Sequence, residues 1–212
     1  HAQTSAKAGT PAAEIQALAP ELMAAIVIIE GNEGVGTGFV ARVGNQVCVV
    51  TNLHVLGDNE KLAVKTLKGD TIAIAGISGA IGADIALLRV ADPATVPAPL
   101  ELADKLQDSV KIGTKVVVAG NRLGGGVITQ TSGQVKGIGP ARIEVDARFQ
   151  PGNSGSPIID LETKKVLGVA TYTSTRAVAG NTLLSLRAEK RWFGYRLDTA
   201  AKWEEIDWAK WQ

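Results

Sequence analysis

The stretch Phe149-Gln150-Pro151-Gly152-Asn153-Ser154-Gly155-Ser156-Pro157 places one serine in a short, glycine-flanked loop that leads into an apolar run. Gly152 and Gly155 can adopt backbone conformations that other residues avoid, so the loop can turn sharply and leave the Ser154 hydroxyl unshielded. The N–H groups of residues 152–154 can then converge on one point, where they would stabilise an oxyanion. Taken alone, the same residues also fit an ordinary turn.

Two other segments supply the side chains that an active serine needs. His54, the only histidine besides His1, follows the apolar run 46–51, and Asp84 precedes another apolar run. Burying a carboxylate costs several kcal/mol unless it is hydrogen-bonded, and a histidine N–H is a natural partner. A core histidine and a turn-capping aspartate are the plainer alternatives. The order His54, Asp84, Ser154 is one of the known orders of a serine triad.

Composition narrows the function classes. The 212 residues include 22 Lys+Arg and 21 Asp+Glu, giving a net charge of +1, which provides no basic surface for nucleic acid. The longest apolar run, Leu22–Ile29, is far shorter than the ~18 residues of a membrane span. Cys48 is the only cysteine, so we expect a small core residue, no intrachain disulfide and no thiolate metal site. We predict neither metal nor cofactor.

Short runs rich in valine and isoleucine, separated by glycine-bearing turns, predict two groups of strands. The first group is Ala24–Glu30, Thr37–Val43, Gln46–Thr51, Lys61–Thr66, Thr71–Ala75 and Asp84–Val90. The second is Lys115–Ala119, Gly126–Gly137, Ala141–Ala147, Ser156–Asp160 and Lys165–Ser174. A proline-rich connection over about 93–110 separates them, which predicts an all-β fold of two packed barrels.

The two ends carry weaker signals. Residues 1–12 are rich in Ala, Ser and Thr and predict a flexible tail, and Thr10-Pro11 predicts a short helix around 11–19 that Pro20 stops. A tail of this kind, without an initiating Met, is typical of an exported protein, either secreted or periplasmic. A remnant of cloning would have the same composition and is the alternative interpretation. A helix over about 198–210 is predicted, its tryptophans anchoring it to the fold or offering a partner-binding surface.

Four segments together resemble the chymotrypsin-fold serine proteases, and most closely the bacterial HtrA-type, trypsin-like peptidase domain. They are Gly36–Val40, Thr51–Val55, Asp84–Leu88 and Pro151–Pro157. The resemblance covers roughly residues 24–175 and implies two six-stranded antiparallel barrels with the active site between them. It implies one peptidase domain over 13–212, with an N-terminal barrel at about 24–92, a linker at about 93–110 and a C-terminal barrel at about 111–190.

The resemblance also implies roles for individual residues. His54 would be the general base, Asp84 its orienting partner, Ser154 the nucleophile, and the N–H groups of Gly152 and Ser154 the oxyanion hole. The primary substrate pocket would be lined by Arg148, Phe149, Gln150, Ala170, Thr171, Tyr172 and Thr173. Arg148 could favour an acidic substrate side chain or pair with a surface carboxylate, and Tyr172 could narrow the pocket. An α/β-hydrolase is excluded because no histidine follows Ser154.

The sequence departs from the family pattern in three places. Ser156 stands where the family usually has glycine, which could alter the oxyanion hole, and Asn153 stands where digestive trypsins carry an aspartate. Only 38 residues follow Ser174 in this sequence, so we expect no peptide-binding PDZ module of the HtrA kind in it. We therefore expect a serine endopeptidase acting on polypeptides, of unknown oligomeric state. The alternative is a protease-fold protein that binds peptides or a partner through an inactive or conditionally assembled site.

Overall fold

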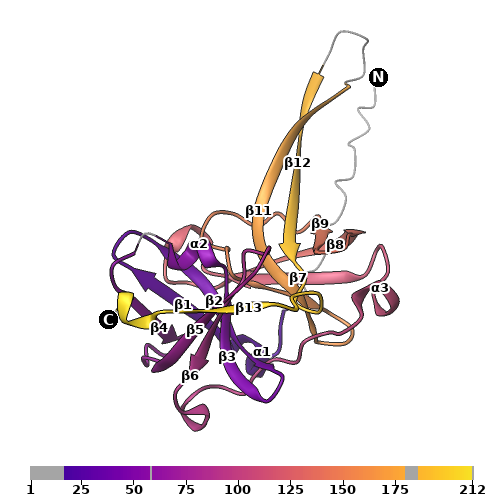
Figure 1. The fold of residues 1–212 in the computed structure, drawn as a ribbon. Coiled ribbons are helices and arrows are strands. Elements are labelled where there is room, and N and C mark those ends of the chain that lie inside the picture. The colour runs from indigo at the N-terminus through magenta and orange to yellow at the C-terminus, as the bar shows by residue number, and fades with distance from the viewer. Residues whose placement is uncertain (1–16, 58, 180–185, 212) are drawn as a thin grey trace, which may run out of the picture.

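Two β units packed side by side form the molecule (Figure 1). The computed structural model describes residues 17–57, 59–179 and 186–211. The first unit is a seven-stranded antiparallel sheet in the order β13-β5-β6-β3-β2-β1-β4. Its strands are β1 (Ile26–Gly31), β2 (Val35–Val43), β3 (Gln46–Thr51), β4 (Leu62–Thr66), β5 (Ile74–Ala80), β6 (Ala86–Val90) and β13 (Trp203–Ile206). Strands β1 to β6 overlap the six runs predicted for the first group.

The second unit is a closed six-stranded barrel in the order β10-β11-β12-β9-β8-β7. Its strands are β7 (Lys115–Gly120), β8 (Thr129–Ile138), β9 (Arg142–Val145), β10 (Pro157–Asp160), β11 (Val166–Ala179) and β12 (Leu186–Tyr195). The all-β prediction is confirmed, and five of these strands overlap the predicted second group. Beyond the barrel, β11 and β12 continue as a two-stranded hairpin that projects from the body (Figure 1).

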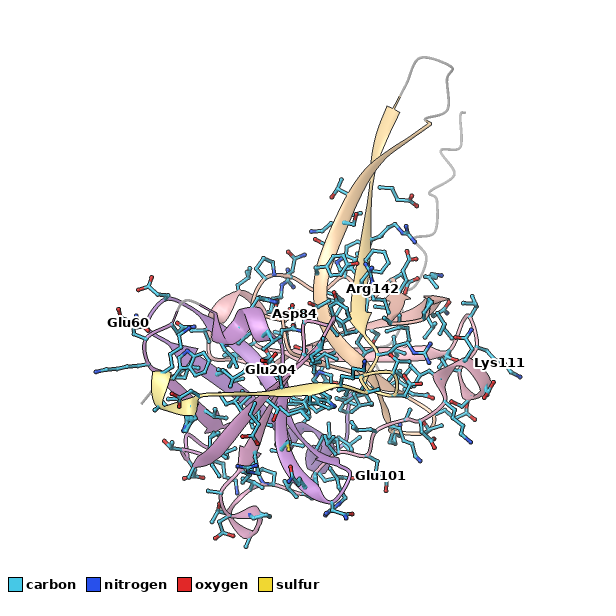
Figure 2. The ribbon with its side chains drawn as sticks, in the orientation of Figure 1. Glu60, Asp84, Glu101, Lys111, Arg142 and Glu204 are labelled. Carbon is cyan, nitrogen blue, oxygen red and sulfur yellow. The ribbon has the colours of Figure 1, made fainter. Side chains whose placement is uncertain are left out.

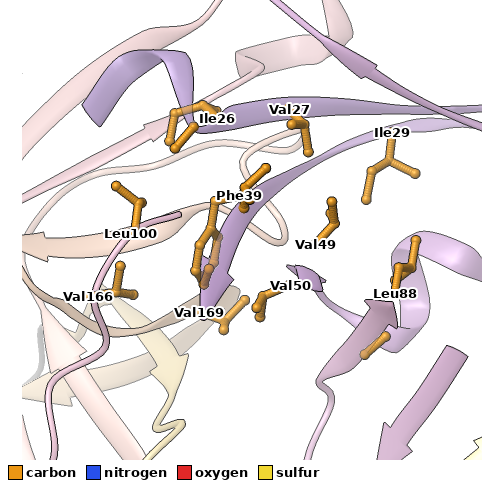
Figure 3. Close-up of a cluster of buried hydrophobic side chains, with 14 of the residues drawn as sticks. Ile26, Val27, Ile29, Phe39, Val49, Val50, Leu88, Leu100, Val166 and Val169 are labelled. Atoms are coloured by element: carbon orange, nitrogen blue, oxygen red, sulfur yellow. The ribbon is translucent and has the colours of Figure 1, made fainter. Parts of the chain in front are cut away.

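Apolar side chains hold the two units together as well as filling each one. Figure 3 shows Phe39 of β2 lying among core residues of the first sheet and close to Val166 and Val169 of β11. A second cluster, which includes Val118 and Ile143, fills the barrel. Removal of this surface from water, at about 25 cal/mol per Å² of apolar area, is the main force that joins the units.

Short helices occupy the connections. They are α1 (Pro20–Ala24), α2 (Leu53–Leu56), α3 (Leu106–Ser109), and the 3₁₀ turns η1 (Pro93–Thr95), η2 (Arg122–Gly124) and η3 (Trp208–Trp211). Within the ranges described above, no helix has the length and apolar character to cross a bilayer. The helix predicted around 11–19 lies largely outside the described residues, and Pro20 begins α1 rather than stopping a helix, as its fixed φ suits a first helical position.

The helix predicted over about 198–210 is wrong. Residues Trp203–Ile206 form β13 instead, paired with β5, and only η3 is helical. The free edge of β5 offers backbone hydrogen bonds that a solitary short helix cannot replace, so tertiary pairing overrides the local signal. The anchoring role of the tryptophans is confirmed, because Trp211 is buried in the shared core and Trp203 and Trp208 pack against it.

Candidate active site

The three predicted site residues come from three separate elements that meet at the junction of the units. His54 lies in α2, the single turn that follows β3, and Asp84 lies two residues before β6. Ser154 lies in the loop that leads into β10 of the barrel. Asp84 accordingly sits near the centre of the molecule in Figure 2. The structure therefore places the side chains of His54 and Asp84, in the first unit, beside the loop of the second unit that carries Ser154.

His54 and Asp84 form a close pair. His54 Nδ1 lies 2.5 Å from Asp84 Oδ2, and the His54 backbone N–H donates to Asp84 Oδ1 at 3.0 Å. Their side chains are 49% and 26% exposed, so His54 is not a core residue and Asp84 is less buried than the sequence suggested. Asn52 Nδ2 donates to the Asp84 carbonyl oxygen at 2.6 Å, which fixes the backbone at this corner.

A third donor to Asp84 comes from the other unit. The Thr171 hydroxyl donates to Asp84 Oδ2 at 2.9 Å. Burial raises the pKa of Asp84, but the hydrogen bonds from the side chain and backbone of His54 and from Thr171 outweigh it. The pKa of Asp84 consequently lies below its ordinary value, and the carboxylate stays charged at neutral pH.

Ser154 faces His54 across a shared pocket. A pocket of about 330 Å³ is lined by both His54 and Ser154, and Gly152 forms part of its wall. The Ser154 hydroxyl donates to the Thr171 carbonyl oxygen at 3.4 Å, and no hydrogen bond joins it to His54 among the described residues. Catalytic hydrogen bonds are often long before substrate binds, so the shared pocket is the informative observation.

The serine loop has the shape that the glycines predicted. Gly152 and Gly155 have φ of +89° and +86°, and a Cβ at Gly155 would lie 1.9 Å from Thr37 O. Within the described part of the chain, the N–H groups of Gly152 and Ser154 donate to no protein acceptor. Two free donors beside the serine are what an oxyanion hole requires.

Thr37 of β2 clamps this loop. Its hydroxyl donates to Gly152 O at 2.8 Å and accepts from Asn121 N at 2.9 Å, and its N–H donates to Ser154 O at 3.0 Å. The Thr51 hydroxyl in turn donates to Thr37 O at 2.7 Å. Sequence reasoning noted Gly36–Val40 only as part of a resemblance. In the sequence, the glycines on either side of Thr37, Gly36 and Gly38, were the one signal that another segment packs closely against this strand.

The residues predicted to line the primary substrate pocket do not lie together in one pocket. None of Arg148, Phe149, Gln150, Thr171, Tyr172 or Thr173 lines the pocket shared by His54 and Ser154. Phe149 is buried inside the barrel, Arg148 is exposed, and the Thr171 hydroxyl points to Asp84. Tyr172 stacks on Phe193 at 5.2 Å and lines a separate pocket of about 480 Å³. Their role in specificity stays a prediction.

The two unusual loop residues are both fully buried. Asn153 Oδ1 accepts from Gln150 N at 3.2 Å, so it braces the loop from inside. The Ser156 hydroxyl has no hydrogen-bond partner among the described residues, and a Cβ at Gly120 would lie 1.9 Å from it, so Gly120 provides its space. Cys48 is buried as predicted, and its burial raises the pKa of its thiol.

Comparison with known proteins agrees with this geometry. Residues 36–169 match the trypsin-like peptidase domain family. The chain belongs to that family. Within it, the trypsin-like domain is 29% identical to the periplasmic pH-dependent serine endoprotease DegQ of Escherichia coli, over 66% of this chain and 31% of that protein. It is 31% identical to the mitochondrial serine protease HTRA2 of Bos taurus, over 75% of this chain and 38% of that protein.

Solved structures show the same chymotrypsin-like fold. Two crystal structures of Rv3671c from M. tuberculosis, both inactive forms and one of them a serine-to-alanine mutant, superpose on the trypsin-like domain with TM-scores of 0.60 and 0.61. Each is 25% identical and matches 84% of this chain. The chain spans about a third of the length of the curated relatives named above.

No group of three or more His, Cys, Asp and Glu side chains that could hold a metal ion occurs in the described ranges.

Proposed function

We propose that the protein is a serine endopeptidase that hydrolyses peptide bonds through His54, Asp84 and Ser154. The observation that carries the proposal is the paired His54 and Asp84 facing Ser154 in one pocket, beside two free backbone N–H groups. Serine, imidazole and carboxylate in this arrangement form an activated nucleophile. Family membership supports the same activity.

The mechanism follows from the contacts. Ser154 Oγ attacks the substrate carbonyl carbon while His54 Nε2 takes the hydroxyl proton, and the N–H groups of Gly152 and Ser154 stabilise the oxyanion. His54 then gives the proton to the leaving amine, which breaks the peptide bond and leaves an acyl-enzyme. Water then attacks the acyl carbon while His54 takes its proton, the bond from that carbon to Ser154 Oγ breaks, and His54 returns the proton to Ser154 Oγ. Asp84 accepts the Nδ1–H hydrogen bond and stabilises the imidazolium throughout.

A second candidate is a protease-fold protein whose site assembles only under certain conditions. It is favoured by the Ser154 hydroxyl, which donates to Thr171 O rather than to His54. A crystal structure of the similar Rv3671c protease is described as an inactive form, which supports keeping this candidate. In this case polypeptides would bind at the junction, and cleavage would wait for a partner or ligand.

A fluorophosphonate probe separates the two candidates, because it reacts only with an activated serine. We expect a stoichiometric mass addition on Ser154 that is absent in Ser154→Ala, together with cleavage of a peptide library. Labelling that appears only after a partner or ligand is added would favour the conditional site. A folded protein that is not labelled would contradict the endopeptidase.

The cellular location is part of the same proposal. DegQ of Escherichia coli is named as a periplasmic endoprotease, and a DegP-like relative in Brucella suis as a probable periplasmic one. We infer an exported protein, secreted or periplasmic, whose substrates are polypeptides. Fractionation of the native host tests the location, and recovery in the cytoplasmic fraction would contradict it.

A further inference from the structure

The pocket that holds His54 and Ser154 has a wall that the mechanism does not use. This wall consists of Glu33 and Gly34 from the turn between β1 and β2 and Val35 at the start of β2, together with Val55 and Asn59 from the segment after His54. Among the residues that the structure describes, Glu33 is the only Asp, Glu, Lys or Arg that lines the pocket. A ligand group that enters here therefore meets the Glu33 carboxylate.

Two asparagines fix this wall to the segment that carries His54. Asn59 Oδ1 accepts from Glu33 N at 2.8 Å, and Asn59 Nδ2 donates to Val55 O at 3.1 Å. Asn32 Oδ1 accepts from the N–H groups of Glu60 and Lys61 at 2.8 and 3.2 Å. The turn is thus held in place before any ligand binds, which lowers the entropy cost of binding.

The carboxylate of Glu33 is available for a cation. Asn32 Nδ2 donates to Glu33 Oε1 at 3.2 Å and orients the side chain. No Lys, Arg or His in the described part of the chain forms an ion pair with it. Glu33 therefore carries an uncompensated negative charge at the rim of the pocket.

The position of β11 tells which part of a substrate reaches this wall. Residues 172–175 of β11 pair with β12, and on their other edge no described strand pairs with them. An extended peptide can add to that edge as a further strand. Ser154 contacts Thr171, at the end of the edge, whereas the Glu33 wall contains no β11 residue. The segment before the scissile bond then lies along β11, and the segment after it enters the Glu33 pocket.

We propose that Glu33 selects substrates with Lys or Arg directly after the scissile bond. This inference rests on the proposed endopeptidase activity. The basic side chain enters between Val35, Val55 and the braced turn, so its ammonium or guanidinium group reaches the Glu33 carboxylate. An exposed pair of this kind changes rates by about two- to five-fold, and more in low salt.

Acyl transfer tests the leaving-group side directly. A peptide ester forms the acyl-enzyme, and an added amino acid amide competes with water for it. The acceptor amine attacks the ester carbon, its proton passes through His54, and Ser154 Oγ leaves with that proton as a new peptide bond forms. The acceptors are argininamide, glycinamide and the α-amide of glutamic acid, and the measured quantity is the ratio of aminolysis to hydrolysis.

We expect the wild type to prefer argininamide over glycinamide by about three-fold or more, and over the glutamic acid amide by a larger factor. Glu33→Gln should abolish the preference and Glu33→Lys should reverse it. Glu60→Gln is the matched control, because Glu60 is an exposed carboxylate on the braced segment that does not line the pocket. Figure 2 shows it well away from Asp84. This control should keep the wild-type preference.

Labelling of Ser154 by the fluorophosphonate in every variant separates the two proposals. Normal labelling without a preference for argininamide, or with a preference that persists in Glu33→Gln, would overturn the role of Glu33 alone. A wild-type protein that is neither labelled nor acylated would overturn the endopeptidase and this inference together.

Discussion

Thr37 and Gly152 are joined across the junction of the two β units, with the Thr37 hydroxyl donating to Gly152 O at 2.8 Å. Thr37 is fully buried, and the same hydroxyl accepts from Asn121 N. One side chain of the first sheet thus holds two segments of the barrel. The loop that carries Ser154 is shaped by the unit to which it does not belong.

Removing this hydroxyl should weaken both folding and acylation. Thr37→Val keeps the volume but leaves the Asn121 N–H buried without an acceptor, so we expect a loss of about 1–3 kcal/mol in the free energy of unfolding. The rate of fluorophosphonate labelling should fall by about tenfold as the loop relaxes, whereas Thr37→Ser should retain most of it. Equal labelling rates in the valine and serine variants would show that the hydroxyl does not position the loop.

Asp84→Asn should reduce peptide turnover by about 10⁴. An amide in this position no longer holds His54 Nδ1–H as a carboxylate does, and it gives no charge to stabilise the imidazolium. Steady-state kcat on a peptide substrate measures the effect, with circular dichroism confirming the fold. A loss of less than tenfold would exclude Asp84 as the orienting partner.

Gly155→Ala should displace the serine loop. Its φ of +86° disfavours an L side chain, and the new Cβ would lie 1.9 Å from Thr37 O. A shift of about 1 Å in a catalytic group can cost ~10² in rate, so labelling should fall by that factor. Gly44→Ala is the control, since its φ is also positive, at +58°, but nothing lies near its Cβ. That variant should lose stability and keep its labelling rate.

The buried pair of Arg196 and Asp198 should make stability depend on pH. Their side chains are 4% and 6% exposed, and Arg196 Nη2 lies 2.7 Å from Asp198 Oδ2. Burial raises the pKa of Asp198, but hydrogen bonds from Arg196 and from Leu106 N outweigh it, so the pKa lies below its ordinary value. The stabilisation is therefore present above the unfolded-state pKa of about 3.9 and is lost as pH falls through the lower folded-state value.

Urea unfolding of Asp198→Asn against the wild type measures this dependence. Breaking a buried pair should cost about 3–5 kcal/mol at pH 7, and the difference should shrink below about pH 4. Glu101→Gln removes the exposed partner of Lys165, 3.6 Å away, and should change stability by less than about 1 kcal/mol at either pH. A difference for Asp198→Asn that stays constant down to pH 2 would contradict the linkage.

The sequence predicted strands well where both faces of the strand are buried. Gln46–Thr51 was predicted with the bounds that β3 has, because its valines fill the core continuously. Strand β12 was not predicted, since Leu186–Tyr195 carries charges without a polar and apolar alternation. Strand β13 was mistaken for a helix because its partner, β5, lies more than a hundred residues earlier in the chain.

The candidate site also has features that the sequence predicted and features that it did not. Local glycines predicted the shape of the serine loop. His54, the only internal histidine, and Asp84, which precedes an apolar run, were candidates from the sequence, and the resemblance assigned their roles. The contacts of Thr37 with the loop and of Thr171 with Asp84 both cross between units. No local pattern encodes such contacts, because they depend on how two finished sheets pack.

The position of β13 near the end of the chain determines when the first sheet can be completed during translation. A ribosome delivers the chain from its N-terminus, and domains generally begin to fold as they emerge. The first sheet, however, lacks its outermost strand until the entire barrel and then Trp203–Ile206 have been translated. During that interval the outer edge of β5 is open to pairing with a neighbouring nascent chain, which is the situation in which sheet proteins aggregate. Recombinant expression should therefore benefit from slower translation or from a chaperone that covers the edge.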